Sequence, residues 1–237
     1  MSTMRDTMSS YGTQTQWAGE FLDKWLPAAF QDLASIAHPS PYEAGRTLFS
    51  EKEPPHGVYL VLEGEVKLSM NSIDGRRLIL RIAKKGEILG LASALSGNLY
   101  EVTAETLYPC RLAFVSRREF LGILVRHPEV YQTLTEELTR NITMACEQLR
   151  TVGLSASVPE KLARLLLDWS ENGQTTECGT RLRFSLTHGE IGEYIGASRE
   201  TVTRIFSDFK CQELLESRGT TLIIADRKAL EIYAGIA

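Results

Sequence analysis

The sequence predicts an α+β fold in which an N-terminal double-stranded β-roll is followed by a long helix and a C-terminal winged helix-turn-helix. Evenly spaced glycines separate short alternating strands over residues 42–115. No glycine or proline occurs after Pro128 until Gly153, which is typical of a long helix. Two apolar-periodic segments meet at Gly196, as two helices joined by a tight turn do. We expect a tail over residues 1–16, the β-roll over 17–127, the long helix over 128–153 and the winged helix-turn-helix over 154–237.

The composition is that of a globular chain. Its 237 residues are 43% hydrophobic and 24% charged, and no apolar run approaches the ~18 residues of a membrane span. Residues 1–16 are rich in Ser, Thr and Gln and do not resemble a signal peptide. The four cysteines are far apart, which argues against a disulfide framework and a zinc site. We therefore expect a cytoplasmic protein with no membrane partner.

The N-terminal half begins with a predicted helix from about Gln16 to Ala37, because its apolar residues recur every three or four positions. The pattern changes after Pro39 and Pro41. Strands are predicted on both sides of Gly64, at residues 58–63 and 66–70, and again at 77–82, 101–107 and 111–115. Asn71–Gly75 has the composition of a turn.

Ser116 is predicted to open a short helix, and Pro128 a longer one that runs to Val152. Apolar residues of the longer helix recur at spacings of 4, 4, 3, 4 and 3, close to a heptad stripe. They are Leu134, Leu138, Ile142, Ala145, Leu149 and Val152. The stripe predicts a helix that pairs with its own copy in a homodimer. A core helix packed on its own β-roll is the alternative, and a single stripe does not separate the two.

The C-terminal part contains a small-residue hinge at residues 153–158, a helix at 159–170, a loop at 171–180 and a strand at 181–186. Thr187 and Glu190 have the spacing of a capping box, so a helix begins at Thr187. Gly196 ends this helix. Ser198 then caps a second helix, whose apolar residues face inward.

The outward face of the second helix carries Arg199, Glu200, Thr203 and Arg204. Arg bonds guanine through two atoms and Glu accepts from a cytosine amino group, so these residues are predicted to contact bases in a major groove. The alternative is a solvated face with an internal Glu200–Arg204 pair. A non-DNA signalling module is the corresponding rival function.

Contacts to the DNA backbone are predicted around the same helices and in a turn and strand over residues 217–225, which has the pattern of a wing. The candidates are Thr187, His188, Ser198, Lys210, Arg218 and Thr220. Such contacts give affinity and register rather than sequence choice. The net charge is −4, and residues 155–237 hold ten Lys and Arg against twelve Asp and Glu, so only a local cationic surface supports binding.

With these motifs in place, residues 21–225 resemble the family of the catabolite activator protein and the fumarate–nitrate regulator. The stretch Gly57–Val66 is similar to that family's β-roll core, and Ser198–Arg204 is very similar to its recognition helix. The resemblance implies a homodimer that binds and bends double-stranded promoter DNA and contacts RNA polymerase. It also implies that residues matching Arg199, Glu200 and Arg204 read half-sites like TGTGA.

The resemblance implies an effector pocket in which this sequence departs from the cyclic-nucleotide branch. Gly86 and Glu87 match that branch, whereas Tyr100 and Glu101 stand in place of its phosphate-binding Arg-Ser pair. Ala145 and Cys146 stand in place of an adenine-binding Thr-Ser pair on the long helix. A phosphate requires a cation and donors, and a carboxylate repels it. We therefore expect no cofactor and no binding of cyclic AMP in the way of that branch; the sequence leaves open which effector is bound, or whether there is one.

Other chemistries have less support. The first cysteine is Cys110, so the N-terminal cysteine cluster of an iron–sulfur sensor is missing. His56 and Cys110 are conceivable haem ligands, but structural roles are more common. Cys146 is a candidate redox switch, although a buried small apolar residue is the more frequent role. The histidines are isolated, and no phosphate loop or nucleophile elbow occurs, so we expect neither a metal site nor an enzyme.

Overall fold

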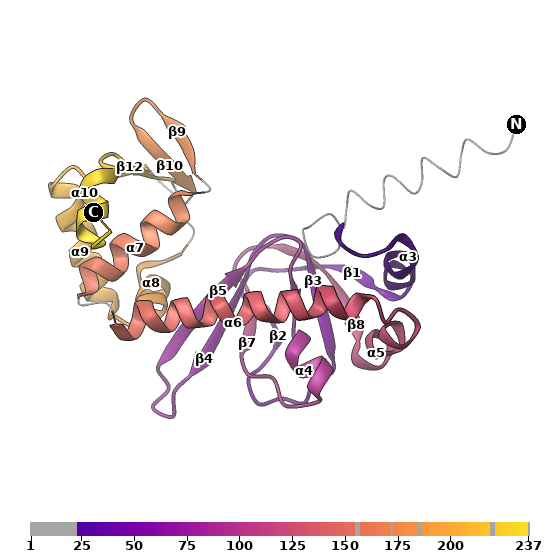
Figure 1. The fold of residues 1–237 in the computed structure, drawn as a ribbon. Helices are drawn as coiled ribbons and strands as arrows, with labels where there is room; N and C mark the ends of the chain where they lie inside the picture. Colours follow the sequence, from indigo (N-terminus) through magenta and orange to yellow (C-terminus); the bar gives the residue numbers. More distant parts are fainter. Residues whose placement is uncertain (1–22, 155–156, 172, 184–185, 219–220, 237) are drawn as a thin grey trace, which may run out of the picture. The chain divides into compact units, whose positions relative to one another are not determined.

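The computed structural model describes residues 23–154, 157–171, 173–183, 186–218 and 221–236, which form two compact units (Figure 1). Unit 1 contains residues up to 70 and residues 80–145, and unit 2 contains residues 71–79 and residues from 146 onward. The division falls inside helix α6 (Val130–Leu154) rather than after residue 153. The expected tail and residues 155–156 of the expected hinge lie outside the described residues.

Two four-stranded sheets form the β-roll, as the sequence predicts. The first has the order β1-β8-β3-β6, with β1 (His38–Tyr42), β8 (Cys110–Ser116), β3 (Gly57–Glu63) and β6 (Ile88–Leu89). The second has the order β2-β7-β4-β5, with β2 (Thr47–Phe49), β7 (Thr103–Thr106), β4 (Val66–Asn71) and β5 (Arg77–Ala83). β1 is an edge strand, which is where prolines such as Pro39 and Pro41 are tolerated because they lack an N–H for the ladder.

β3 shows why this part of the chain folds into a roll. Alternate residues of a strand point to opposite faces. Val58, Leu60 and Leu62 belong to the core that also contains helical residues, whereas Tyr59 and Val61 belong to a second core shared with residues of the other sheet. Because both faces are covered, the strand is an almost continuous apolar run, GVYLVLE.

Three short helices complete unit 1: α3 (Pro27–Ile36), α4 (Leu91–Ser96) and α5 (Arg117–Arg126). The Ser116 side chain caps α5 by accepting from the Glu119 N–H, as predicted. The prediction of one helix from Gln16 to Ala37 was wrong, because α3 begins only at Pro27 and Leu26 is extended, with ψ 147°. A proline disfavours helical geometry in the residue before it. α4 was not predicted.

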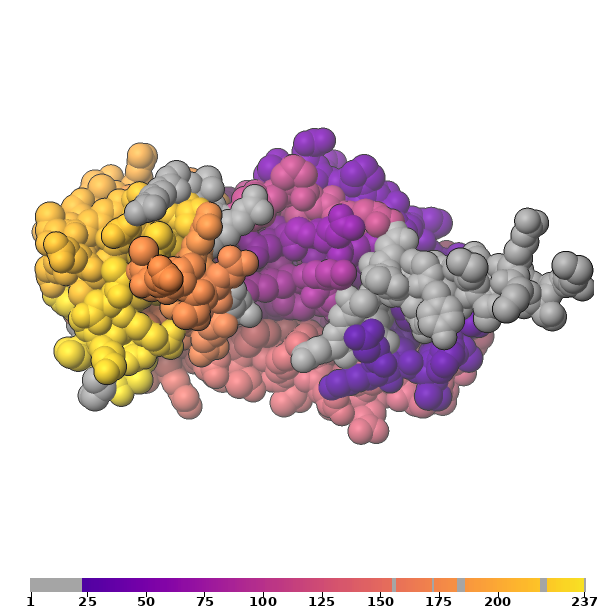
Figure 2. Space-filling model, turned by 90° about the horizontal axis from the view of Figure 1, so that it is seen from above, coloured from indigo at the N-terminus to yellow at the C-terminus, as the bar shows by residue number. Residues whose placement is uncertain are grey.

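Unit 2 combines α7 (Val158–Ser170), α8 (His188–Ile195), α9 (Arg199–Cys211) and α10 (Arg227–Tyr233) with a small antiparallel sheet. The sheet has the order β11-β12-β10-β9, with β11 (Leu215–Arg218), β12 (Thr221–Ile224), β10 (Gly179–Arg183) and β9 (Gln174–Thr176). The β9–β10 hairpin projects from the unit (Figure 1), and its orange residues lie beside yellow C-terminal residues in Figure 2.

The loop predicted over residues 171–180 was partly wrong, because Thr175 and Thr176 pair with Thr180 and Gly179. The sequence signal was two adjacent β-branched residues followed by a glycine, here with φ 117°. No helix in the described part of the chain is long and apolar enough to cross a membrane.

Candidate nucleic-acid interface and ligand cavity

α8 begins with the predicted capping box. The Glu190 N–H donates to the Thr187 hydroxyl at 3.2 Å, and the Thr187 N–H donates to the Glu190 carboxylate at 3.0 Å. This pair of bonds satisfies two N–H groups that a helix start leaves without partners. Ile191 and Ile195 are buried beneath the helix, so the position of α8 is fixed from both its start and its inner face.

Two glycines set the turn between α8 and α9. Gly196 ends α8 in the left-handed region, with φ 68° and ψ 42°, as the sequence predicts. Gly192 was not predicted to matter, yet a Cβ there would lie 2.5 Å from the Ala197 carbonyl oxygen. The turn therefore returns so close to α8 that only a glycine fits at residue 192.

α9 is held by its cap and by its inner face. The Ser198 side chain accepts from the Thr201 N–H at 3.2 Å. Val202, Ile205, Phe206 and Phe209 are all buried. These contacts fix the rotation of the helix about its own axis. Its other face is exposed to solvent.

The four predicted base-contact residues lie exposed on that other face, within the first two turns of α9. Neither Arg199 nor Arg204 forms an ion pair with any residue that the structure describes, so the alternative Glu200–Arg204 pair is not present there. Hydrogen bonds from its own backbone N–H and from the Ser198 hydroxyl, with the charge of Arg199, hold the pKa of Glu200 below its ordinary value. Two cations and one anion therefore face solvent together.

The Thr203 hydroxyl is already engaged within the protein, unlike the guanidinium groups of Arg199 and Arg204. It donates to the Arg199 carbonyl at 2.9 Å and lies 2.9 Å from Nδ1 of His188. The His188 ring stacks on Phe206, with centroids 4.8 Å apart. Burial, and then the charges of Lys210 and Arg199, lower the pKa of His188. His188 therefore braces α9 from the start of α8, a role that sequence spacing did not reveal.

The structure describes the surroundings of only some of the residues that are predicted to contact the DNA backbone. Thr187 and Ser198 are exposed at the starts of the two helices, and Lys210 is exposed in the last turn of α9. Arg218 lies at the end of β11, which pairs with β12 in the segment predicted as the wing. The side chain of Arg218 and all of Thr220 lie outside the described residues.

The stripe predicted on α6 divides between two environments. Leu134 is 1% exposed and belongs to the core of its own chain, so its assignment to a dimer seam was wrong. Leu138 is half-buried and packs against the same core. Ile142 and Leu149 are 66% and 62% exposed, while Ala145 and Val152 are half-buried. The exposed row is instead made of apolar and small residues at spacings of 4, 4, 3, 4 and 3: Tyr131, Thr135, Thr139, Ile142, Cys146 and Leu149.

A cavity of about 430 Å³ lies in unit 1, on the inner side of α6. Of the predicted effector residues, Tyr100, Glu101 and Ala145 line it, whereas Gly86, Glu87 and Cys146 do not. The Tyr100 hydroxyl donates to the Gly57 carbonyl at 2.8 Å and accepts from the N–H groups of His56 and Gly57. Tyr100 therefore offers a ligand only its ring.

The positive charge in this cavity is already paired before any ligand enters. Arg81 is the one cation among its lining residues, and it is paired with the Glu87 carboxylate, which also accepts from the Lys84 N–H. Glu101 adds a carboxylate that forms no ion pair with any residue that the structure describes. A cyclic phosphate would therefore meet two carboxylates, those of Glu87 and Glu101, against one guanidinium group.

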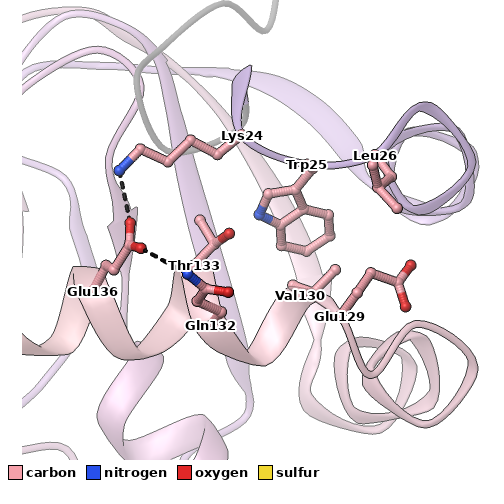
Figure 3. Close-up of a pocket in the computed structure, with 8 residues that line it drawn as sticks. All are labelled: Lys24, Trp25, Leu26, Glu129, Val130, Gln132, Thr133 and Glu136. Atoms are coloured by element: carbon pink, nitrogen blue, oxygen red, sulfur yellow. Dashed lines mark hydrogen bonds and ion pairs between the residues drawn. The ribbon is translucent and has the colours of Figure 1, made fainter.

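A second cavity, of about 350 Å³, lies between the segment before α3 and the start of α6 (Figure 3). Lys24 donates to Glu136 at 2.8 Å across it, and the Trp25 indole points toward the helix start. The chain before residue 23 lies outside the described residues.

The candidate haem and redox residues lie apart. The His56 ring packs against Tyr100, and Cys110 is buried beside the Glu65 carbonyl, so that burial raises the pKa of its thiol. Cys146 is exposed rather than buried. The described residues hold no cluster of three or more His, Cys, Asp or Glu side chains suited to a metal ion.

The geometry defines a two-part protein, with a β-roll that encloses a cavity and a capped helix-turn-helix that presents charged side chains. Residues 39–127 match the cyclic nucleotide-binding domain family, and residues 160–233 match the Crp-like helix-turn-helix domain family. The chain belongs to the Crp/Fnr family of DNA-binding transcription regulators.

Relatives named as regulators, not as enzymes, are similar over most of the chain. A "CRP-like cAMP-activated global transcriptional regulator" of Mycobacterium tuberculosis is 28% identical over 86% of this chain and 91% of its own. The "Transcriptional activatory protein AadR" of Rhodopseudomonas palustris is 29% identical over 88% and 86%.

Solved structures share the fold. FixK2 of Bradyrhizobium japonicum has a TM-score of 0.72 at 23% identity, covering 84% of this chain and 97% of its own. The "c-di-GMP Responsive Global Regulator CLP" of Xanthomonas campestris has a TM-score of 0.73 at 22% identity, covering 84% and 99%.

Proposed function

We propose that the chain is a homodimeric regulator that reads TGTGA-like half-sites in promoter DNA through Arg199, Glu200 and Arg204, and that it acts on RNA polymerase. One observation carries the proposal: these three charged side chains lie exposed together on the first two turns of α9. Neither arginine forms an ion pair with a residue that the structure describes.

The chemistry of the three side chains suits this half-site. TGTGA and its complement offer guanine O6 and N7 acceptors to the two guanidinium groups, and cytosine amino donors to the Glu200 carboxylate. Since the Thr203 hydroxyl is engaged within the protein, Thr203 would contribute through its methyl group, which suits the methyl of thymine. Two-fold pairing would place two such helices about one turn of DNA apart.

Fluorescence anisotropy tests the reading of DNA. The full chain is titrated with a TGTGA palindrome and with a scrambled duplex at one fixed salt concentration, because phosphate contacts make affinity depend on salt. We expect Arg199→Ala to weaken binding to the palindrome by roughly 1–3 kcal/mol, about 5- to 150-fold in Kd, and to relax choice at one guanine.

Lys228→Ala is the matched control, because it removes one exposed cation of unit 2 that lies on α10 rather than α9. It should leave the preference for the palindrome intact. If wild type and Arg199→Ala bind both duplexes equally, the chain is not a sequence-specific reader through this residue.

We also propose that cyclic AMP is not the effector. The names of the relatives do not decide this, since one is called cAMP-activated and another c-di-GMP responsive. The support comes from the paired Arg81 and from Glu101 in the cavity. Calorimetric titration of the full chain with cyclic AMP should show no micromolar binding. Micromolar binding would favour the alternative, a cyclic-nucleotide-responsive regulator.

A further inference from the structure

The cavity of unit 1 is mainly apolar. All its lining residues belong to that one unit. Apolar side chains come from both sheets, from α4 and from α6: Phe49, Leu68, Met70, Leu80, Ile88, Leu91, Val102, Ile142 and Ala145 among them. A volume of about 430 Å³ is within the ~300–1,000 Å³ of small-molecule sites. Such a lining favours ligands that gain from leaving water.

The few polar side chains of the cavity differ in whether they are already engaged. Arg81 is paired with Glu87, and the Ser93 hydroxyl donates to the Leu99 carbonyl at 3.3 Å. The Asn141 amide forms no hydrogen bond with any residue that the structure describes, and its Oδ1 is buried. A buried amide oxygen that accepts no hydrogen bond costs free energy that a ligand can recover by donating to it.

We propose that this cavity binds a neutral, largely apolar molecule whose single polar group hydrogen-bonds to the Asn141 amide. As the effector of the regulator proposed above, it would touch Asn141, Ile142 and Ala145 on one side of α6 and the α4 residues Leu91 and Ser93 opposite. This ligand class differs from the cyclic nucleotides for which the matching domain family is named.

The proposed ligand would contact α6, the helix that carries the exposed row from Tyr131 to Leu149. Asn141 and Ile142 are adjacent on α6, and Ile142 is both a lining residue and 66% exposed. A molecule held at Asn141 therefore covers part of the Ile142 side chain, and occupancy changes the surface that α6 presents.

Calorimetry with two matched probes tests the proposal on the full chain. 2-Naphthol carries a hydroxyl, and 2-methylnaphthalene carries a methyl group of similar size at the same place. We expect 2-naphthol to bind wild type. We expect Asn141→Leu to shift the ratio of the two dissociation constants by about tenfold in favour of the methyl compound, the usual size of one hydrogen bond.

Two further variants separate the amide from folding. Asn98→Leu makes the same exchange at an exposed position outside the cavity, and it should leave the ratio unchanged. Ala145→Phe places a ring in the cavity, and it should abolish binding of both probes even if Asn141→Leu does not fold. No measurable binding of 2-naphthol to wild type, or an unchanged ratio in folded Asn141→Leu, overturns the proposal.

These readouts contain no DNA, so the two proposals fail separately. A chain that prefers the TGTGA palindrome but does not bind 2-naphthol refutes only the ligand class. A chain that binds 2-naphthol at Asn141 but treats both duplexes alike refutes only the DNA-reading proposal.

Discussion

His188 joins the two helices of the helix-turn-helix through one imidazole ring. The ring stacks on Phe206 and its Nδ1 faces the Thr203 hydroxyl, while Lys210 and Arg199 place positive charge nearby. A proton on this ring would be added to a partly buried group beside two cations. The folded state therefore favours the neutral form.

This preference predicts a loss of stability in mild acid. The pKa of His188 is lowered from 6.5 in the folded chain, so its contribution is fully present above pH 6.5 and is lost as pH falls through the folded value. We expect thermal unfolding of unit 2 to lose more stability between pH ~7.5 and ~5.5 in wild type than in His188→Asn. His38→Asn, at an exposed site of unit 1, should keep the wild-type dependence. Identical pH profiles for wild type and His188→Asn would contradict the account.

The roles of single residues were predicted correctly where they depend only on residues nearby in the sequence. Thr187 and Glu190 are three residues apart, and Ser198 directly precedes its helix, so both caps follow from spacing alone. The contact between His188 and Thr203 spans fifteen residues and depends on how two helices cross. The lack of a described partner for Asn141 Oδ1 likewise depends on what surrounds it in the fold, and the sequence shows only an asparagine between Arg140 and Ile142.

The turn between α8 and α9 is the element whose geometry is most constrained. Gly192 approaches the Ala197 carbonyl so closely that an added Cβ would lie 2.5 Å from its oxygen, which requires backbone movement. Movement there changes the angle between α8 and α9, and with it the direction of Arg199.

We expect Gly192→Ala to lower the free energy of unfolding by about 1–3 kcal/mol, the usual cost of overpacking, and to weaken binding to the palindrome. Urea unfolding and anisotropy measure the two effects. Gly189→Ala is the matched control on the same helix, because its Cβ would lie an ordinary 3.7 Å from Thr187 Oγ1. It should keep or raise stability. Equal losses of stability in both variants would contradict the role of the close approach at Gly192.

At the scale of elements, hydrophobic patterns, glycines and capping residues predicted most of the fold. Alternation and glycines predicted β3, β4, β5 and β8, and capping residues predicted α5, α8 and α9. A helix was also predicted at residues 159–170, where α7 lies. What the patterns missed depends on context. α4 is six residues long, β9 is stabilised mainly by pairing with β10, and Pro27 outweighed a continuous apolar periodicity.

α6 shows that the sequence pattern also does not determine how two copies of the chain would pair. The predicted stripe combined Leu134, which is buried in the core of unit 1, with Ile142 and Leu149, which remain exposed. Helical periodicity specifies which residues share a face, but not whether that face meets its own chain or another. The exposed row from Tyr131 to Leu149 is the surface that we propose pairs with a second copy.

We predict that Ile142→Glu combined with Leu149→Glu converts the dimer to a monomer, because like charges would then be buried at the seam. Sedimentation velocity at micromolar concentration measures the change, and affinity for the palindrome should fall with it. Val125→Glu is the control, since Val125 is equally apolar and 81% exposed but lies on α5. A double variant that remains dimeric would place the seam elsewhere.

The prolines of β1 have a consequence for the chain in concentrated solution. β1 pairs with β8 along one side, and Pro39 and Pro41 occupy this border strand. A free strand border can recruit another molecule's backbone and start a growing fibre. With two of its five residues lacking an amide hydrogen, this border is a poor template for such stacking. Self-association through this border of the roll is thereby disfavoured, which leaves the exposed row of α6 as the surface for the proposed pairing.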